Sequence, residues 1–196
     1  MTTLKLFVLT MCFMTAANAF GQVDPDPDGI GLYFDEGATI NAIEAEVPGP
    51  VTAYLIGTNL SRQGGLRFWE AIVSAPGQSA TIWGGARNGL NLATNMPPGG
   101  NSFVYTVSVS DPNSALPGTV ILGDLEIWFD WDVPIGLHVH GVSFDQPAYW
   151  VDADPTETHF MYPSSGSVDR PVAMINGSAP VPVEDMAWGH IKGLYR

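Results

Sequence analysis

Four aspartates close to the N-terminus have the spacing of a calcium-binding loop. Counted from Asp24, the acids Asp26, Asp28 and Asp35 and the glycine Gly29 occupy positions that an EF-hand fills with carboxylate ligands and a tight turn. Calcium takes about six to eight oxygen ligands, so the spacing predicts a bound calcium ion that stabilises the domain. The alternative is an extended Asp-Pro leader that precedes the first strand. The last position of the motif favours this alternative, because it holds Asp35 where an EF-hand has Glu.

A second candidate site lies in residues 124–132, where apolar and polar residues alternate strictly. This period of two predicts a strand with one face in the core. Its other face presents Trp128 between Glu126 and Asp130. An aromatic ring covers the apolar face of a sugar while carboxylates accept its hydroxyl protons, so this face is a candidate carbohydrate-binding surface. The alternatives are a solvated acidic strand and a glycosidase carboxylate pair.

Residues 145–171 are rich in Pro, Asp, Ser and Thr and are predicted to form a long loop region. Tyr149 and Trp150 lie within it and add aromatic surface for the same class of ligand. A separate pair, His138 and His140, would face the same side of a strand, as a metal site requires. Two partly exposed strand histidines are the alternative interpretation.

The remaining motifs that carry enzyme chemistry are absent from the sequence. Cys12 is the only cysteine, and the chain has neither a Gly-x-Ser-x-Gly elbow nor a glycine-rich phosphate loop. We therefore assign no catalytic residue and expect a protein that is not an enzyme. A metal-dependent or glycoside-cleaving enzyme on the same fold remains the alternative from another functional class.

Residues 1–19 have the three regions of a secretory signal peptide. Lys5 is followed by an apolar run over residues 6–16 and by an Ala-Asn-Ala sequence that ends at Ala19. The run is shorter than the roughly 20 apolar residues of a membrane-spanning helix, and no second such run follows. We expect cleavage near Ala19 and an exported protein, secreted, periplasmic or on the cell surface, without stable membrane insertion.

The exported part of the chain would be strongly acidic. Loss of Lys5 leaves six basic and twenty acidic residues, a formal charge of −14. Nucleic acids and anionic membranes attract basic surfaces, so neither is an expected partner. An extracellular protein or a polysaccharide is expected instead.

The rest of the sequence predicts an all-β domain. Strand-length apolar runs alternate with Gly, Pro, Asn and Asp breaks, which is typical of a single β-sandwich or jelly roll of about nine strands. The strands are expected at residues 31–34, 39–45, 51–58, 66–74, 79–83, 102–110, 119–130, 136–144 and 172–175. The expected organisation is a leader and first strand over 20–36, the sandwich over 37–182 and a short C-terminal helical tail over 183–196.

Three segments together resemble small exported bacterial proteins of the GLYFD…WGxIKxLYR type: residues 31–35, residues 51–59 and residues 188–196. In addition, a strand ending at Asn59, a glycine break and the aromatic-rich run 66–74 are loosely similar to cohesin-type sandwiches. That resemblance implies a nine-stranded jelly roll that binds a protein or a carbohydrate. The prediction from sequence is thus a non-enzymatic extracytoplasmic binding or surface-structural module, with a carbohydrate-binding module as the alternative.

Overall fold

The computed structural model describes residues 24, 26–92, 100–109, 115–130, 132–178 and 180, and all regular structure within them is β-strand. The predicted all-β class is therefore confirmed. The strands are β1 (Gly29–Tyr33), β2 (Ala42–Ile43), β3 (Gly49–Ser74), β4 (Ala80–Ala86), β5 (Gly89–Asn91), β6 (Ser102–Val109), β7 (Ala115–Phe129), β8 (Ile135–His140), β9 (Ala148–Val151), β10 (Asp154–Phe160), β11 (Tyr162–Pro163) and β12 (Ala173–Ile175).

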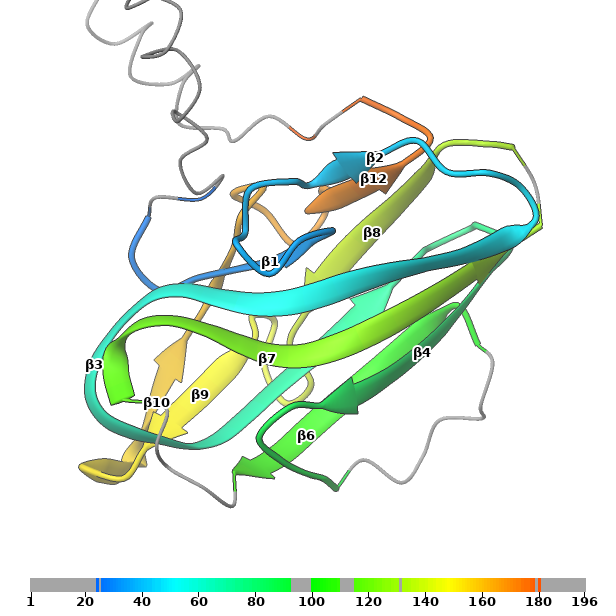
Figure 1. Ribbon diagram of the computed structural model, residues 1–196. Coiled ribbons are helices and arrows are strands. Elements are labelled where there is room, and N and C mark those ends of the chain that lie inside the picture. Colours follow the sequence, from blue (N-terminus) through cyan, green and yellow to red (C-terminus); the bar gives the residue numbers. More distant parts are fainter. Residues whose placement is uncertain are drawn as a thin grey trace, which may run out of the picture.

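The long strand β3 links the two layers of the sandwich. Its first part runs across one layer, and the chain then bends and returns in the other layer (Figure 1). The sequence predicted a break near Gly64 and Gly65, but the strand pairing continues through both residues. Gly64 has a φ of 120°, a value that side chains other than glycine rarely adopt. Gly64 therefore allows β3 to turn without ending.

Two sheets result from this bend. The first sheet has the order β4, β7, β3, β1 and β11, with antiparallel neighbours except for the parallel pair β1–β11. The second sheet has β5, β6 and the later part of β3, with β8 and β9 pairing with successive stretches of the same edge of β3. β10 extends this sheet beyond β9, and β12 and β2 extend it beyond β8.

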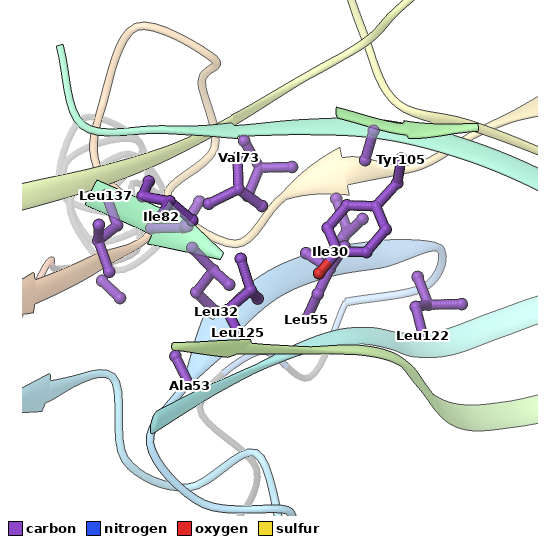
Figure 2. Close-up of a cluster of buried hydrophobic side chains, with 14 of the residues drawn as sticks. Ile30, Leu32, Ala53, Leu55, Val73, Ile82, Tyr105, Leu122, Leu125 and Leu137 are labelled. Atoms are coloured by element: carbon purple, nitrogen blue, oxygen red, sulfur yellow. The ribbon is translucent and has the colours of Figure 1, made fainter. Parts of the chain in front are cut away.

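Alternating side chains from the two sheets fill the space between the layers (Figure 2). Leu125 and Ala53 point inward from the first sheet, and Val73 and Tyr105 from the second. Trp69 packs against Tyr105 with ring centroids 5.0 Å apart. Burial of such side chains stabilises a fold by about 1.5–3 kcal/mol each. In a domain without disulfides, we expect this burial to be the main source of stability.

The predicted strands differ from the observed ones in further places, and β5 was not predicted. The stretch predicted as a long loop, residues 145–171, contains β9, β10 and β11. The strand predicted over 39–45 is reduced to the two residues of β2, and the one predicted over 136–144 ends at His140. The predicted signal peptide and C-terminal helix lie outside the residues that the structure describes. Within the described part, no helix is long and apolar enough to span a membrane.

Candidate functional site

The outer face of the first sheet carries the predicted acidic and aromatic strand. On β7, Leu125 and Ile127 are buried in the core, whereas Glu126 and Trp128 are exposed. The alternation over these residues is thus as predicted, and Trp128 keeps 46% of its surface accessible. Asp130 is exposed directly after the end of β7.

A second exposed indole, which the sequence analysis did not single out, lies beside Trp128. Trp83 on β4 is 43% exposed and pairs with Glu126, while Thr81 pairs with Trp128. The two tryptophans are therefore diagonal neighbours on one face of adjacent antiparallel strands. A strand was predicted over 79–83, but its partner and register are not visible in the local pattern. We call Trp83, Trp128, Glu126, Asp124 and Thr52 the tryptophan platform.

The platform contains a shallow hollow of about 380 Å³ lined by Thr52, Trp83, Gly84, Gly85, Asp124, Leu125 and Glu126. Gly85 borders open space, because a Cβ atom added there would meet no atom within 4 Å. The indole Nε1 of Trp128 donates a hydrogen bond to Glu126. The hollow therefore exists because Gly85 has no side chain to fill the space beside Trp83, Asp124 and Glu126.

One cationic side chain, Arg87, borders the platform and donates hydrogen bonds to two carboxylates. Arg87 donates from Nε to both carboxylate oxygens of Asp124, at 2.9 and 3.0 Å, and from Nη2 to Glu36. Its guanidinium lies 5.4 Å from the ring centroid of Tyr54. The hydrogen bonds to Asp124 and Glu36 raise the pKa of Arg87 above its usual value, so Arg87 stays charged and its charge is balanced locally.

The second sheet carries a different exposed feature, the segment 141–147 between β8 and β9. Both strands pair with β3, β8 with residues 72–74 and β9 with residues 66–70. The segment therefore interrupts what would otherwise be one strand. We call residues 141–147 the apolar loop.

Glu70 of β3 holds the apolar loop in place. Its side chain is buried, with 3% of the residue accessible, and accepts hydrogen bonds from Ser143 N at 2.8 Å and Ser143 Oγ at 2.9 Å. Gly141 N donates to Asp145 O at 3.2 Å. A Cβ atom at Gly141 would collide with the backbone of Phe144 and Gln146. The loop is consequently a closed, anchored structure.

The apolar loop exposes hydrophobic side chains. Phe144 is 42% accessible and packs edge-on against Phe160 of β10, with ring centroids 5.3 Å apart. Val142 is also exposed. A hollow of about 440 Å³ lies at this pair and is completed by Asp145 and Gln146. The result is an apolar centre with a polar border.

Comparison with known proteins finds similarity in the fold. A solved structure of the sixth cohesin of scaffoldin B from Acetivibrio cellulolyticus, in complex with a mutant Cel5 dockerin, superposes with a TM-score of 0.51 at 8% identity, over 78% of this chain and all of that chain. The second type II cohesin module of the ScaA adaptor scaffoldin of the same organism gives 0.50 at 6% identity, over 84% and 98% of the two chains. The fold is cohesin-like. No family model and no curated protein sequence matches the chain.

The cohesin-like fold confirms the β-sandwich architecture that the sequence resemblance implied, while the described residues form twelve strands in place of the nine expected. The resemblance of residues 31–35 and 188–196 to small exported bacterial proteins stays a prediction. A fold by itself does not place a binding site, so a binding function must reside in exposed surfaces such as the tryptophan platform and the apolar loop.

The cohesin-like fold does not bring the four predicted calcium ligands together. Asp24 and Asp35 lie beyond opposite ends of strand β1. Asp35 accepts hydrogen bonds from Thr39 and Ile40. Burial alone would raise its pKa, but these hydrogen bonds lower it below the usual value.

Two other acids of that motif, Asp24 and Asp28, also bond to the protein itself. Asp24 is buried and accepts from Thr58 Oγ1, and Asp28 accepts from Ser61 and from Tyr149 Oη. Among the described residues, no three His, Cys, Asp or Glu side chains are grouped so that they could hold a metal ion. Calcium binding stays a prediction, and the EF-hand arrangement that motivated it is not formed.

Tyr149 and Trp150, predicted as exposed loop aromatics, lie on strand β9. Tyr149 is fully buried and donates from its hydroxyl to Asp28 Oδ1 at 2.7 Å. Burial and the neighbouring Asp28 raise the pKa of Tyr149. Trp150 is half-buried against Phe68, with ring centroids 5.1 Å apart. Tyr149 is therefore not exposed for contact with a ligand, and neither Tyr149 nor Trp150 lies on the tryptophan platform.

His138 and His140 face the same side of β8, as predicted. Their rings stack with centroids 5.9 Å apart, and His138 Nδ1 lies 3.4 Å from Val168 O. His159 lies on β10 and is buried against Tyr149. Burial and the neighbouring His138 lower the pKa of His140, and Asp169 partly offsets this.

The lowered pKa of His140 predicts a loss of stability on mild acidification. The unfolded state, with an ordinary histidine pKa of about 6.5, takes up a proton before the folded state does. The free energy of unfolding should therefore fall as the pH drops from 7.5 to 5.5. Urea unfolding of the wild type and of His140→Gln at both pH values measures this. The variant should lose less stability than the wild type, and equal losses would contradict the prediction.

Proposed function

We propose that the chain is an exported, non-enzymatic binding module that captures a protein partner on its apolar loop and Phe160. The observation that carries this proposal is the exposure of Phe144, on a loop that Glu70 anchors, beside the exposed Phe160 of β10. Exposed apolar groups with a polar border are typical of protein interaction sites.

The anchoring of the loop supports this function energetically. Ordering a mobile loop on binding costs free energy, about 0.5–1.5 kcal/mol for each immobilised side chain. The two hydrogen bonds from Ser143 to Glu70 place the loop before any partner arrives. The aromatic pair of Phe144 and Phe160 then offers a preformed contact, and aromatic residues are enriched at interface centres.

Two further observations support the same proposal. One of the cohesin structures that shares this fold was solved in complex with a dockerin. The N-terminal signal-peptide pattern is consistent with a role outside the cytoplasm.

Replacing Phe144 with serine tests the proposed docking site. The tagged wild-type protein is immobilised and exposed to the exported proteins of the cells that produce it. Proteins retained by the wild type should be lost with Phe144→Ser, because the variant removes the apolar centre of the surface. Leu90→Ala, which changes an apolar residue that is 67% exposed on β5 at the opposite edge of the second sheet, is the matched control and should retain them.

The outcome is decided by comparing the three eluates by mass spectrometry. A protein present with the wild type and the control and absent with Phe144→Ser supports the site. A set of proteins that is the same for all three would contradict it. Thermal melting of each variant verifies that the fold is retained.

Polysaccharide binding is a second candidate function, and one specific observation favours it. The exposed indoles Trp83 and Trp128 are diagonal neighbours on a sheet face, with the carboxylate of Glu126 next to both of them. This surface is in the other layer of the sandwich from the apolar loop, so the two functions do not compete for one site.

A further inference from the structure

We propose that the tryptophan platform binds a neutral polysaccharide whose pyranose rings carry equatorial hydroxyl groups, such as a β-linked glucan or xylan. This inference rests on the second candidate function and specifies its ligand class. It is carried by the geometry of the two indoles, by the hollow beside them and by the charge of the surrounding side chains.

The two indoles provide apolar surface at a spacing set by the sheet. Trp83 and Trp128 are diagonal neighbours on adjacent strands, and such neighbours lie about 7–8 Å apart. Both keep more than two-fifths of their surface accessible. A pyranose ring with equatorial hydroxyls has two apolar faces, and an indole can cover one of them. Two indoles on one face therefore suit a chain of rings better than a single sugar.

The acids of the platform fix one indole and provide hydrogen-bond acceptors. Trp128 donates to Glu126, which restrains the indole before binding and lowers the entropy that binding would cost. Ionised carboxylates accept hydrogen bonds only. Sugar hydroxyls are donors, so Glu126 and Asp124 at the hollow match them chemically. Thr52 adds a hydroxyl that can donate or accept.

The glycine at the hollow keeps it open. Gly85 pairs with Asp124 on the same face as Trp83, and a Cβ atom there would meet no atom within 4 Å. A larger side chain at this position would project into the hollow without disturbing the fold. Gly85 thus gives a way to block the site while keeping both indoles.

The charge of the platform selects against acidic polysaccharides. Its ionisable members are Glu126 and Asp124, and the neighbouring Arg87 is engaged by Asp124 and Glu36. The chain as a whole has a formal charge of −13. Uronate or sulfate groups would meet carboxylates with no available cation among these residues, and like charges at short range repel. The ligand is therefore a neutral polysaccharide.

Affinity electrophoresis tests the inference with defined polymers. The wild type runs through native gels containing hydroxyethylcellulose, xylan, alginate or polygalacturonate, and sedimentation with microcrystalline cellulose adds an insoluble ligand. At least one neutral polymer should retard the wild type. Trp83→Ala and Trp128→Ala should each weaken binding by about tenfold or more, an effect expected when a central aromatic contact is lost. Gly85→Gln should weaken it by filling the hollow.

The controls separate loss of the site from loss of the fold. Tyr162→Ala removes an exposed aromatic side chain elsewhere and should bind like the wild type, and melting curves show whether each variant is folded. Binding only to the acidic polymers would overturn the ligand class while keeping the platform as a sugar-binding surface. Binding to none of the polymers, or equal binding by the wild type and both tryptophan variants, would overturn the inference and the second candidate function together. Neither result would bear on protein capture by the apolar loop.

Discussion

Trp69→Ala is expected to destabilise the protein by about 3–5 kcal/mol, the usual cost of truncating a buried aromatic residue. Trp69 is 2% exposed at the centre of β3 in the second sheet. It packs against Tyr105, and its strand neighbours are Val107 and Tyr149. Truncation would leave a cavity between the layers. Each kcal/mol corresponds to about 2–4 °C for a domain of this size, so the melting temperature should fall by roughly 10 °C.

A tryptophan at the surface provides the matched control. Trp83→Ala removes the same side chain from a position that is 43% exposed, and surface changes usually alter stability by less than about 0.5 kcal/mol. Melting curves followed by far-ultraviolet circular dichroism compare the two variants. Equal melting temperatures for Trp69→Ala and Trp83→Ala would contradict the assignment of Trp69 to the core.

Gly141→Val is expected to abolish partner capture by the apolar loop. Any Cβ at residue 141 collides with the backbone carbonyl groups of Phe144 and Gln146, and backbone cannot move aside as a flexible side chain can. The loop must therefore open, which displaces Phe144 from Phe160. Overpacking of this kind costs about 1–3 kcal/mol, so the protein should remain folded while its loop is rearranged.

A substitution at another glycine, Gly85, is the control for the effect on stability. Gly85→Ala adds a methyl group that meets no atom within 4 Å and should leave the melting temperature unchanged. Partner retention and the melting temperature are measured for each variant. Full retention of the partner by Gly141→Val would show that the closed loop is not required for binding.

The β7 strand shows what the sequence predicts well. Strict alternation over residues 124–129 assigned Leu125 and Ile127 to the core and Trp128 to the surface, and the structure has them so. Period two is a local property of a strand with one buried face. It therefore needs no knowledge of the neighbouring strands.

Trp83 and β9 show where local patterns fail. The proximity of Trp83 to Trp128 depends on the register between β4 and β7, which pairs residues far apart in sequence. Residues 145–171 were predicted as a loop because Pro, Asp, Ser and Thr favour turns. Ala148 and Val151 nevertheless form β9 because the edge of β3 offers them hydrogen-bond partners and a core to face. Tertiary contacts here override composition.

The acidic motif shows a different limit of sequence patterns. The spacing of Asp24, Asp26, Asp28 and Asp35 matches a loop that wraps around an ion. In the fold, β1 lies between Asp28 and Asp35 and extends the chain, and a strand rises about 3.3 Å per residue. The five residues of β1 therefore separate acids that a loop would have gathered. Spacing in sequence does not fix distance in space unless the intervening backbone conformation is known.

The most direct test of the proposed function is hydrogen–deuterium exchange of the wild-type protein with and without its captured partner. The proposal predicts slower exchange in residues 141–147 and around Phe160 when the partner is bound, with residues 80–86 of β4 unchanged. Protection of β4 and β7 with no change at residues 141–147 would contradict it, because the partner would then occupy the tryptophan platform and the apolar loop would have no part in binding.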